Sequence, residues 1–182
     1  MGEMIENPEL RTQRLHLRPM SIEDVDRIAL FISDYEVSKW LSRVPYPYEH
    51  EHALDWVAQN AKPKPADETG FAIDRGEGLI GGIGFRLDDG VPDIGYWLAK
   101  PQWGKGFMSE AAEAVIRWLF EVTDHDQIAS GVFEGNDASL RIQEKLGFEI
   151  TGRHDVHCLA QGKDLTHIDT LLKRNQFRPS AA

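Results

Sequence analysis

The sequence predicts an α/β (α+β) fold in which helices cover both faces of one mixed β-sheet. Three observations lead to this prediction. The chain has 182 residues against roughly 150 for a typical domain, so residues 1–182 are expected to form one domain. Three predicted strands with short links lie in its middle, which favours an antiparallel meander. The order continues as helix, strand, helix and strands, which is not the order of a doubly wound Rossmann fold.

The first third of the chain indicates one strand and two helices. Apolar and polar residues alternate over residues 14–18, as in a half-buried strand. Ser21 is a suitable N-cap for a helix over residues 22–32, and a second helix is expected over residues 51–60. Residues 61–69 contain two prolines and are predicted to form a surface loop.

Three strands are expected next, over residues 70–74, 79–87 and 94–99, separated by glycine-containing turns. Apolar residues then recur at helical spacing from residue 109 to residue 122. This pattern predicts a helix that packs on the core.

The last third predicts a strand over residues 128–133 and a helix over residues 138–146 that ends at Gly147. Closing strands are expected from Phe148 to about residue 172. Residues 175–182 are expected to form a flexible tail.

Charge and cysteine content restrict the classes of partner. Lysine and arginine number 20 and aspartate and glutamate 30, which gives a net charge of −10. This charge argues against broad binding to nucleic acid or membrane lipid and fits an amine-bearing partner. One cysteine, Cys158, excludes an internal disulfide framework. No apolar run approaches the roughly 20 residues of a membrane span, so we expect a cytoplasmic protein.

Two glycines, Gly104 and Gly106, stand between a predicted strand and the strongest predicted helix. Glycine lets the backbone turn tightly and approach a ligand closely. The N–H groups of residues 104–109 would then point at one spot ahead of the helix, where the helix dipole is also positive. The pattern predicts a site for phosphate or pyrophosphate.

Two common nucleotide-binding motifs are absent from this loop. A Rossmann fingerprint would need a third glycine near position 109, which is Ser109, and a parallel βαβ unit. The Walker pattern would need Gly-Lys followed by serine or threonine after a four-residue gap. The glycine pair alone is compatible with a tight loop that binds nothing.

Five short segments together resemble the GNAT superfamily of acetyl-CoA-dependent N-acetyltransferases, and within it the branch of ribosomal-protein N-terminal (Rim-type) acetyltransferases. The segments are LRTQRL (10–15), IGYWL (94–98), WGKGFMSEA (103–111), NDAS (136–139) and EKLGF (144–148). The resemblance spans nearly the whole chain. It implies a mostly antiparallel central sheet of about seven strands and acetyl-CoA as the cofactor, with CoA as the product.

The resemblance also implies which residues bind the cofactor. The strand that ends at Ala99 would offer backbone groups to the pantetheine arm. The glycine loop would supply N–H groups to the pyrophosphate, and Asn136 would bind the pantetheine. The implied cofactor-binding residues are Trp97, Leu98, Ala99, Gly104, Lys105, Gly106, Phe107, Met108, Ser109, Asn136 and Ser139.

The catalytic candidates follow from the same resemblance. Asp93 stands where relatives often have a glutamate base, and Ser139 is the first candidate for the acid, with Tyr96 as the second. Many family members have a tyrosine acid at the position of Gln143, and an amide cannot protonate a thiolate. Trp103 also departs from the glutamine or arginine that usually opens the pyrophosphate loop.

No metal site is expected. His154, Asp155, His157 and Cys158 are close in sequence, but a strand would place the two histidines on opposite faces.

The acceptor is an amine-bearing small molecule or a protein N-terminus, and a CoA-binding module without turnover is the alternative of a different class. The oligomeric state, including a homodimer, stays open.

Overall fold

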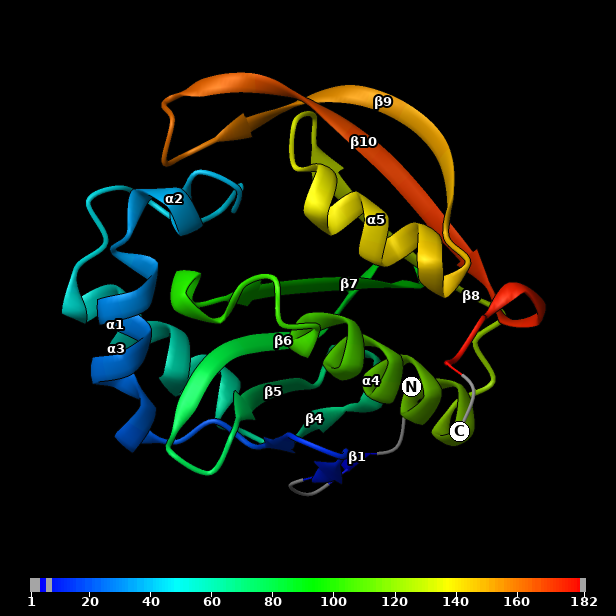
Figure 1. The fold of residues 1–182 in the computed structure, drawn as a ribbon, viewed down its shortest axis with the longest axis horizontal. Coiled ribbons are helices and arrows are strands. Elements are labelled where there is room, and N and C mark those ends of the chain that lie inside the picture. The colour runs from blue at the N-terminus through cyan, green and yellow to red at the C-terminus, as the bar shows by residue number, and fades with distance from the viewer. Residues whose placement is uncertain (1–3, 6–7, 181–182) are drawn as a thin grey trace.

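The computed structural model describes residues 4–5 and 8–180, for residues 4 and 5 the backbone alone, and builds them around one eight-stranded sheet (Figure 1). The strand order is β2-β3-β5-β6-β7-β8-β10-β9, and a two-stranded sheet joins β1 to β4. The strands are β1 (Met4–Ile5), β2 (Leu10–Arg11), β3 (His16–Arg18), β4 (Lys64–Pro65), β5 (Gly70–Asp74), β6 (Leu79–Asp88), β7 (Val91–Leu98), β8 (Gln127–Phe133), β9 (Glu149–Cys158) and β10 (Lys163–Lys173). The predicted mixed, mostly antiparallel sheet is confirmed.

Helices cover both faces of the sheet, as predicted (Figure 1). They are α1 (Val25–Ile32), α2 (Tyr35–Ser38), α3 (His50–Asn60), α4 (Phe107–Val122) and α5 (Asp137–Leu146). One hydrophobic cluster joins α4 to the sheet through Ile94 and Leu98. A second cluster joins α1 and α3 to the opposite face through Trp97. Because side chains alternate along β7, neighbouring residues of this strand face different helices.

The sheet opens between β7 and β8. These strands run parallel and share a single pair of facing residues, Asp93 and Ala129. One further link holds them near this point, because the Ser130 hydroxyl donates to the carbonyl of Ile94 at 2.9 Å. Beyond it the strands diverge, and unpaired backbone edges are a place where an extended, amide-rich ligand can add. We call this opening the splay.

The first predicted helix begins with a 3₁₀ turn, Ile22–Asp24, before α1. Ser21 is its N-cap, and the Ser21 N–H donates to the Asp24 carboxylate at 2.9 Å. Helix α2 is absent from the sequence prediction, because its four residues are too few to show a helical period.

Residues 61–69 do not form the predicted surface loop. They contain β4 and a 3₁₀ turn, Ala66–Glu68, in which Ala66 and Asp67 are buried. The Asp67 carboxylate lies 2.9 Å from the imidazole of His125, at the far end of α4. A partner distant in the sequence therefore draws this segment inward, which its proline content could not indicate.

The chain after β10 packs back on the helices as far as the structure describes it, to residue 180. Phe177 contacts the main hydrophobic cluster, and the Arg178 N–H donates to the carbonyl of Leu146 at 3.0 Å. The Ser180 N–H donates to Glu113 of α4 at 3.0 Å. Most of the expected tail thus has partners on α4 and α5, and residues 181–182 lie outside the described part.

Candidate active site

One cleft of about 1170 Å³ passes through the splay and reaches both faces of the sheet. On one face it is lined by the start of α4 and by α5. On the other face it is lined by the segment after α2, by β6 and by the β9–β10 hairpin. The cleft therefore offers space for two reactants that approach each other from opposite faces.

The glycine loop forms one end of this cleft. Gly104 and Gly106 have φ of 72° and 80°, in the left-handed region that favours glycine. Gly106 is the N-cap of α4, and no side chain among the described residues caps that helix, so its first N–H groups remain open toward the cleft. The loop fits the pyrophosphate of CoA, because these N–H groups and the helix dipole both attract anions.

Two side chains of this loop have structural partners. The Lys105 ammonium donates to the carbonyl of Pro101 at 2.7 Å, which turns it back onto its own loop. The Trp103 indole N–H donates to the carbonyl of Leu98 at 2.7 Å. Trp103 therefore braces the end of β7, which gives a physical reason for a tryptophan at a position where the family usually has glutamine or arginine.

The loop is anchored from the N-terminal strands. Glu110, in the first turn of α4, accepts hydrogen bonds from the Arg14 N–H at 2.9 Å and from the Arg14 guanidinium at 2.7 Å. Burial alone would raise the pKa of Glu110, but hydrogen bonds from Thr12 and Arg14 outweigh it and lower the pKa. The Arg14 guanidinium also donates to the carbonyl of Lys105 at 2.9 Å, so Arg14 joins the loop to α4.

Arg141 and Lys145 of α5 also line the cleft, and the sequence reasoning missed them. They lie four residues apart and therefore on one face of the helix. Their spacing behind Asn136 is the signal that would have found them. They give a local positive charge for an anionic ligand in a chain whose net charge is −10.

Alternate residues of β7 direct their backbone N–H and C=O groups toward the splay. Ile94 faces β8 through its carbonyl, so Tyr96 and Leu98 share that edge. Trp97 and Ala99 face β6 instead: Trp97 pairs with Gly82, and the Ala99 N–H donates to Ile80 at 2.8 Å. Of the β7 residues implied for the cofactor, Leu98 is the one whose backbone borders the splay, and Tyr96 joins it.

Tyr96 and Ser139, the two candidates for the acid, touch each other. Their hydroxyl oxygens lie 2.8 Å apart, on the α5 side of the sheet. Burial raises the pKa of Tyr96, so its phenol stays protonated at neutral pH. Asn136 caps α5 by accepting the Ser139 N–H at 3.4 Å, which leaves the Ser139 hydroxyl available to Tyr96.

Gln143 organises this polar group. Its side chain is 1% exposed, and its amide N–H donates to the hydroxyls of Ser130 at 3.0 Å and of Tyr96 at 3.3 Å. Its amide oxygen accepts the hydroxyl of Thr170 at 2.7 Å. Gln143 thus takes the position of the family's tyrosine as a positioning residue, and it fixes the phenol of Tyr96 beside the cleft.

Replacing Gln143 with leucine should lower the free energy of unfolding by about 1–3 kcal/mol, because the buried hydroxyls of Ser130 and Thr170 lose their partner. Urea unfolding followed by circular dichroism measures this change. Gln59→Leu, at an exposed site of α3, is the control and should leave the midpoint nearly unchanged. Equal midpoints for the two variants would contradict the role of Gln143.

Asp93, the candidate base, lies on the opposite face of β7 from Tyr96. The Arg86 guanidinium donates to its carboxylate at 2.8 Å. Burial raises the pKa of Asp93, and the positive charge of Arg86 partly offsets this effect. The structure therefore separates the candidates into an acid pair on the α5 side and a base on the side of α1 to α3.

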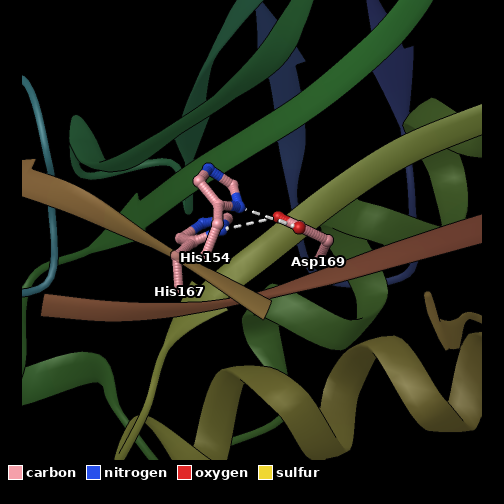
Figure 2. Close-up of side chains that lie close together, drawn as sticks. All are labelled: His154, His167 and Asp169. Carbon is pink, nitrogen blue, oxygen red and sulfur yellow. Dashed lines mark hydrogen bonds and ion pairs between the residues drawn. The ribbon is translucent and has the colours of Figure 1, made fainter. Parts of the chain in front are cut away.

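The β9–β10 hairpin adds three side chains to the face of Asp93 that the sequence reasoning did not group. His154, His167 and Asp169 come together across paired strands (Figure 2). The metal candidates considered from the sequence do not assemble. His157 pairs with Asp164 at the far end of the hairpin, and the Cys158 thiol packs against the carbonyl of Lys39.

A family model described as an acetyltransferase (GNAT) domain matches residues 14–149. The chain belongs to the GNAT acetyltransferases. It is therefore an acetyl-CoA-dependent N-acetyltransferase, and the resemblance noted in its sequence motifs is confirmed. No helix within the described part of this GNAT protein has the length and apolar character to span a membrane.

Similar proteins cover nearly the whole GNAT chain. The uncharacterized N-acetyltransferase p20 of Bacillus licheniformis is 29% identical over 91% of this chain and 96% of its own. A GNAT-family acetyltransferase structure from Bacillus anthracis has a TM-score of 0.80 and 22% identity, covering 92% of this chain and 99% of its own. The ribosomal-protein-S5-alanine acetyltransferase of Vibrio fischeri has a TM-score of 0.74 and 19% identity, covering 94% of this chain and 100% of its own. At these identities the two structures confirm the fold.

Proposed function

We infer that this GNAT enzyme acetylates the N-terminal α-amine of a protein or peptide, with acetyl-CoA as the donor. The observation that carries the proposal is the continuous cleft through the splay, which has the open N–H groups at the start of α4 on one face and carboxylates on the other. A donor bound at the start of α4 and an amine beside Asp93 would meet inside it. Holding two reactants in line can supply several kcal/mol of the rate acceleration.

The chemistry of the amine favours an α-amine over a lysine side chain. An α-amine with a pKa of about 8 is roughly 10% neutral at pH 7, whereas lysine is about 0.04% neutral. A larger fraction of an N-terminal acceptor is therefore already neutral, and less deprotonation by the base is needed. On this face three carboxylates, Asp88, Asp93 and Asp169, lie beside two guanidiniums, Arg43 and Arg86, so a small negative excess gives the cationic fraction a weak attraction. The name of the Vibrio fischeri neighbour, which acts on a ribosomal protein, supports the same class of acceptor.

A panel of acceptors tests the proposal by the release of free thiol from acetyl-CoA. Peptides with a free N-terminus should release thiol, and the same peptides acetylated at the N-terminus should not. Release with spermidine or an aminoglycoside alone would favour a small-amine acetyltransferase. Tight binding of CoA in calorimetry with no acceptor-dependent release would show a binding module without turnover.

A further inference from the structure

We propose that His167, oriented by Asp169, is the base that accepts the proton of the acceptor amine. This inference rests on the proposed function. Asp169 receives two imidazoles: His167 Nδ1 lies 2.9 Å from one carboxylate oxygen and His154 Nδ1 lies 2.9 Å from the other (Figure 2). All three side chains line the cleft.

His167 reaches the part of the sheet that borders the splay. A Cβ atom built on Gly131 of β8 would lie 2.8 Å from His167 Nε2 and would overlap the ring carbon Cε1. The imidazole therefore lies directly on the backbone of Gly131, in space that only a glycine leaves open. Gly131 is two residues beyond Ala129, where the pairing of β7 with β8 stops.

The hydrogen bond to Asp169 sets which nitrogen of His167 carries the proton. A carboxylate only accepts, so Nδ1 must be the donor, and in a neutral imidazole Nε2 is then a free acceptor. Nε2 makes no hydrogen bond to any residue that the structure describes. A carboxylate behind an imidazole holds its orientation and stabilises the imidazolium that forms on proton uptake. The edge of the ring also packs on Phe133, with centroids 5.7 Å apart, which restricts its rotation.

The surrounding charges favour His167 over Asp93 as the base. The carboxylate of Asp93 is occupied by Arg86 at 2.8 Å, and accepting a proton would break that ion pair. Asp93 instead lies close enough to His167 for charges on the two side chains to interact. The titratable and charged groups that line the cleft on the same face as His167 include His154 on β9, Asp169 on β10, Asp93 on β7, Arg86 on β6 and Arg43 after α2.

With His167 as the base, every proton in the acetyl transfer has a donor and an acceptor. The lone pair of a neutral amine forms the new N–C bond with the thioester carbonyl carbon, and the C–S bond breaks as the carbonyl re-forms. His167 Nε2 takes the proton from the amine nitrogen. The hydroxyls of Tyr96 and Ser139, on the other face of the splay, deliver a proton to the departing thiolate. Solvent then reprotonates this pair and receives the proton of His167.

The test compares His167→Gln with wild type for kcat/KM on a free N-terminal peptide across a range of pH. We expect a loss of about 100-fold at neutral pH, and the acid-side decline of kcat/KM should become shallower, because only the protonation of the acceptor amine then remains. CoA affinity measured by calorimetry should stay unchanged, which shows that the cleft is still formed. His157→Gln is the matched control, because this histidine pairs with Asp164 on the same hairpin away from the splay.

Asp169→Asn probes the positioning role. An asparagine whose NH₂ group donates to Nδ1 of His167 favours the tautomer with the ring proton on Nε2, which cannot accept a proton. The rate should therefore fall about tenfold or more, with CoA affinity retained. Retention of kcat/KM within about twofold in His167→Gln would overturn the proposal. A shallower acid-side decline in Asp93→Asn and not in His167→Gln would also overturn it. So would loss of wild-type activity in EDTA with recovery on added Zn²⁺, since the cluster would then be a metal site.

Different results would overturn the role of His167 and the proposed function. Wild-type enzyme that turns over an amine while His167→Gln remains fully active overturns the assignment of the base and leaves the proposed function standing. Wild-type enzyme that binds CoA and releases no thiol with any amine overturns both.

Discussion

Gly106→Trp should abolish CoA binding while the protein stays folded. A Cβ atom at Gly106 would lie 3.4 Å from the Arg14 guanidinium, so the indole would crowd the glycine loop that Arg14 holds at the start of α4. Each hydrogen bond to a charged group contributes about 1.5–3 kcal/mol, so loss of two of them lowers the affinity at least about 100-fold. Isothermal titration calorimetry with CoA measures the loss, and circular dichroism checks the fold.

The matched control is Gly90→Trp in the turn between β6 and β7. Gly90 has φ of 81°, nearly the 80° of Gly106, and a side chain added there meets nothing within 4 Å. The two variants therefore introduce similar backbone strain, and they differ in their surroundings, because Gly106 lines the cleft and its added Cβ atom meets Arg14 at 3.4 Å. Gly90→Trp should bind CoA as wild type does. Unchanged CoA binding in Gly106→Trp would remove the glycine loop from the cofactor site.

Tyr96→Phe and Ser139→Ala should each lower kcat about 100-fold, and the double variant should lose little more than either one. The reason is the 2.8 Å contact between their oxygens, which makes the two hydroxyls one route for the proton that the thiolate receives. Independent residues would multiply to about 10⁴-fold. Steady-state kinetics on wild type, the two single variants and the double variant give the coupling free energy between the two hydroxyls.

Binding and stability measurements separate this role from a structural one. CoA affinity should change much less than kcat in all four proteins, because neither hydroxyl belongs to the glycine loop, although Ser139 is among the residues implied for the cofactor. Tyr35→Phe is the control for removing a phenol oxygen, since Tyr35 is exposed on α2 and does not line the cleft. Multiplicative losses, or full kcat in either single variant, would contradict a shared proton route.

Most helices and strands could be predicted from local sequence patterns. The periodic apolar residues of α4 and the Gly147 end of α5 depend on residues within about four positions of each other. The failures come where a distant partner decides the conformation. Residues 61–69 look like a loop until His125 and the sheet bury Asp67.

In the candidate site, too, the features that depend on neighbouring residues could be predicted, and those that depend on distant partners could not. The glycine loop is visible in the sequence because two glycines and a helix start are consecutive. The role of Gln143 is not visible, because its partners Tyr96 and Thr170 lie 47 and 27 residues away. The sequence places an amide where the family has a tyrosine, and only the packed structure shows that this amide positions another phenol.

By itself, the sequence of this GNAT enzyme determined the glycine loop for which we predict pyrophosphate binding, since backbone N–H groups at a helix start are set by local conformation. The tertiary structure alone decided which side chains line the cleft on the face of Asp93. His154, His167 and Asp169 meet because β9 and β10 pair in one register, and they reach the splay because β7 and β8 diverge after Asp93. Register and divergence depend on contacts across the whole sheet, which no short segment of the chain encodes.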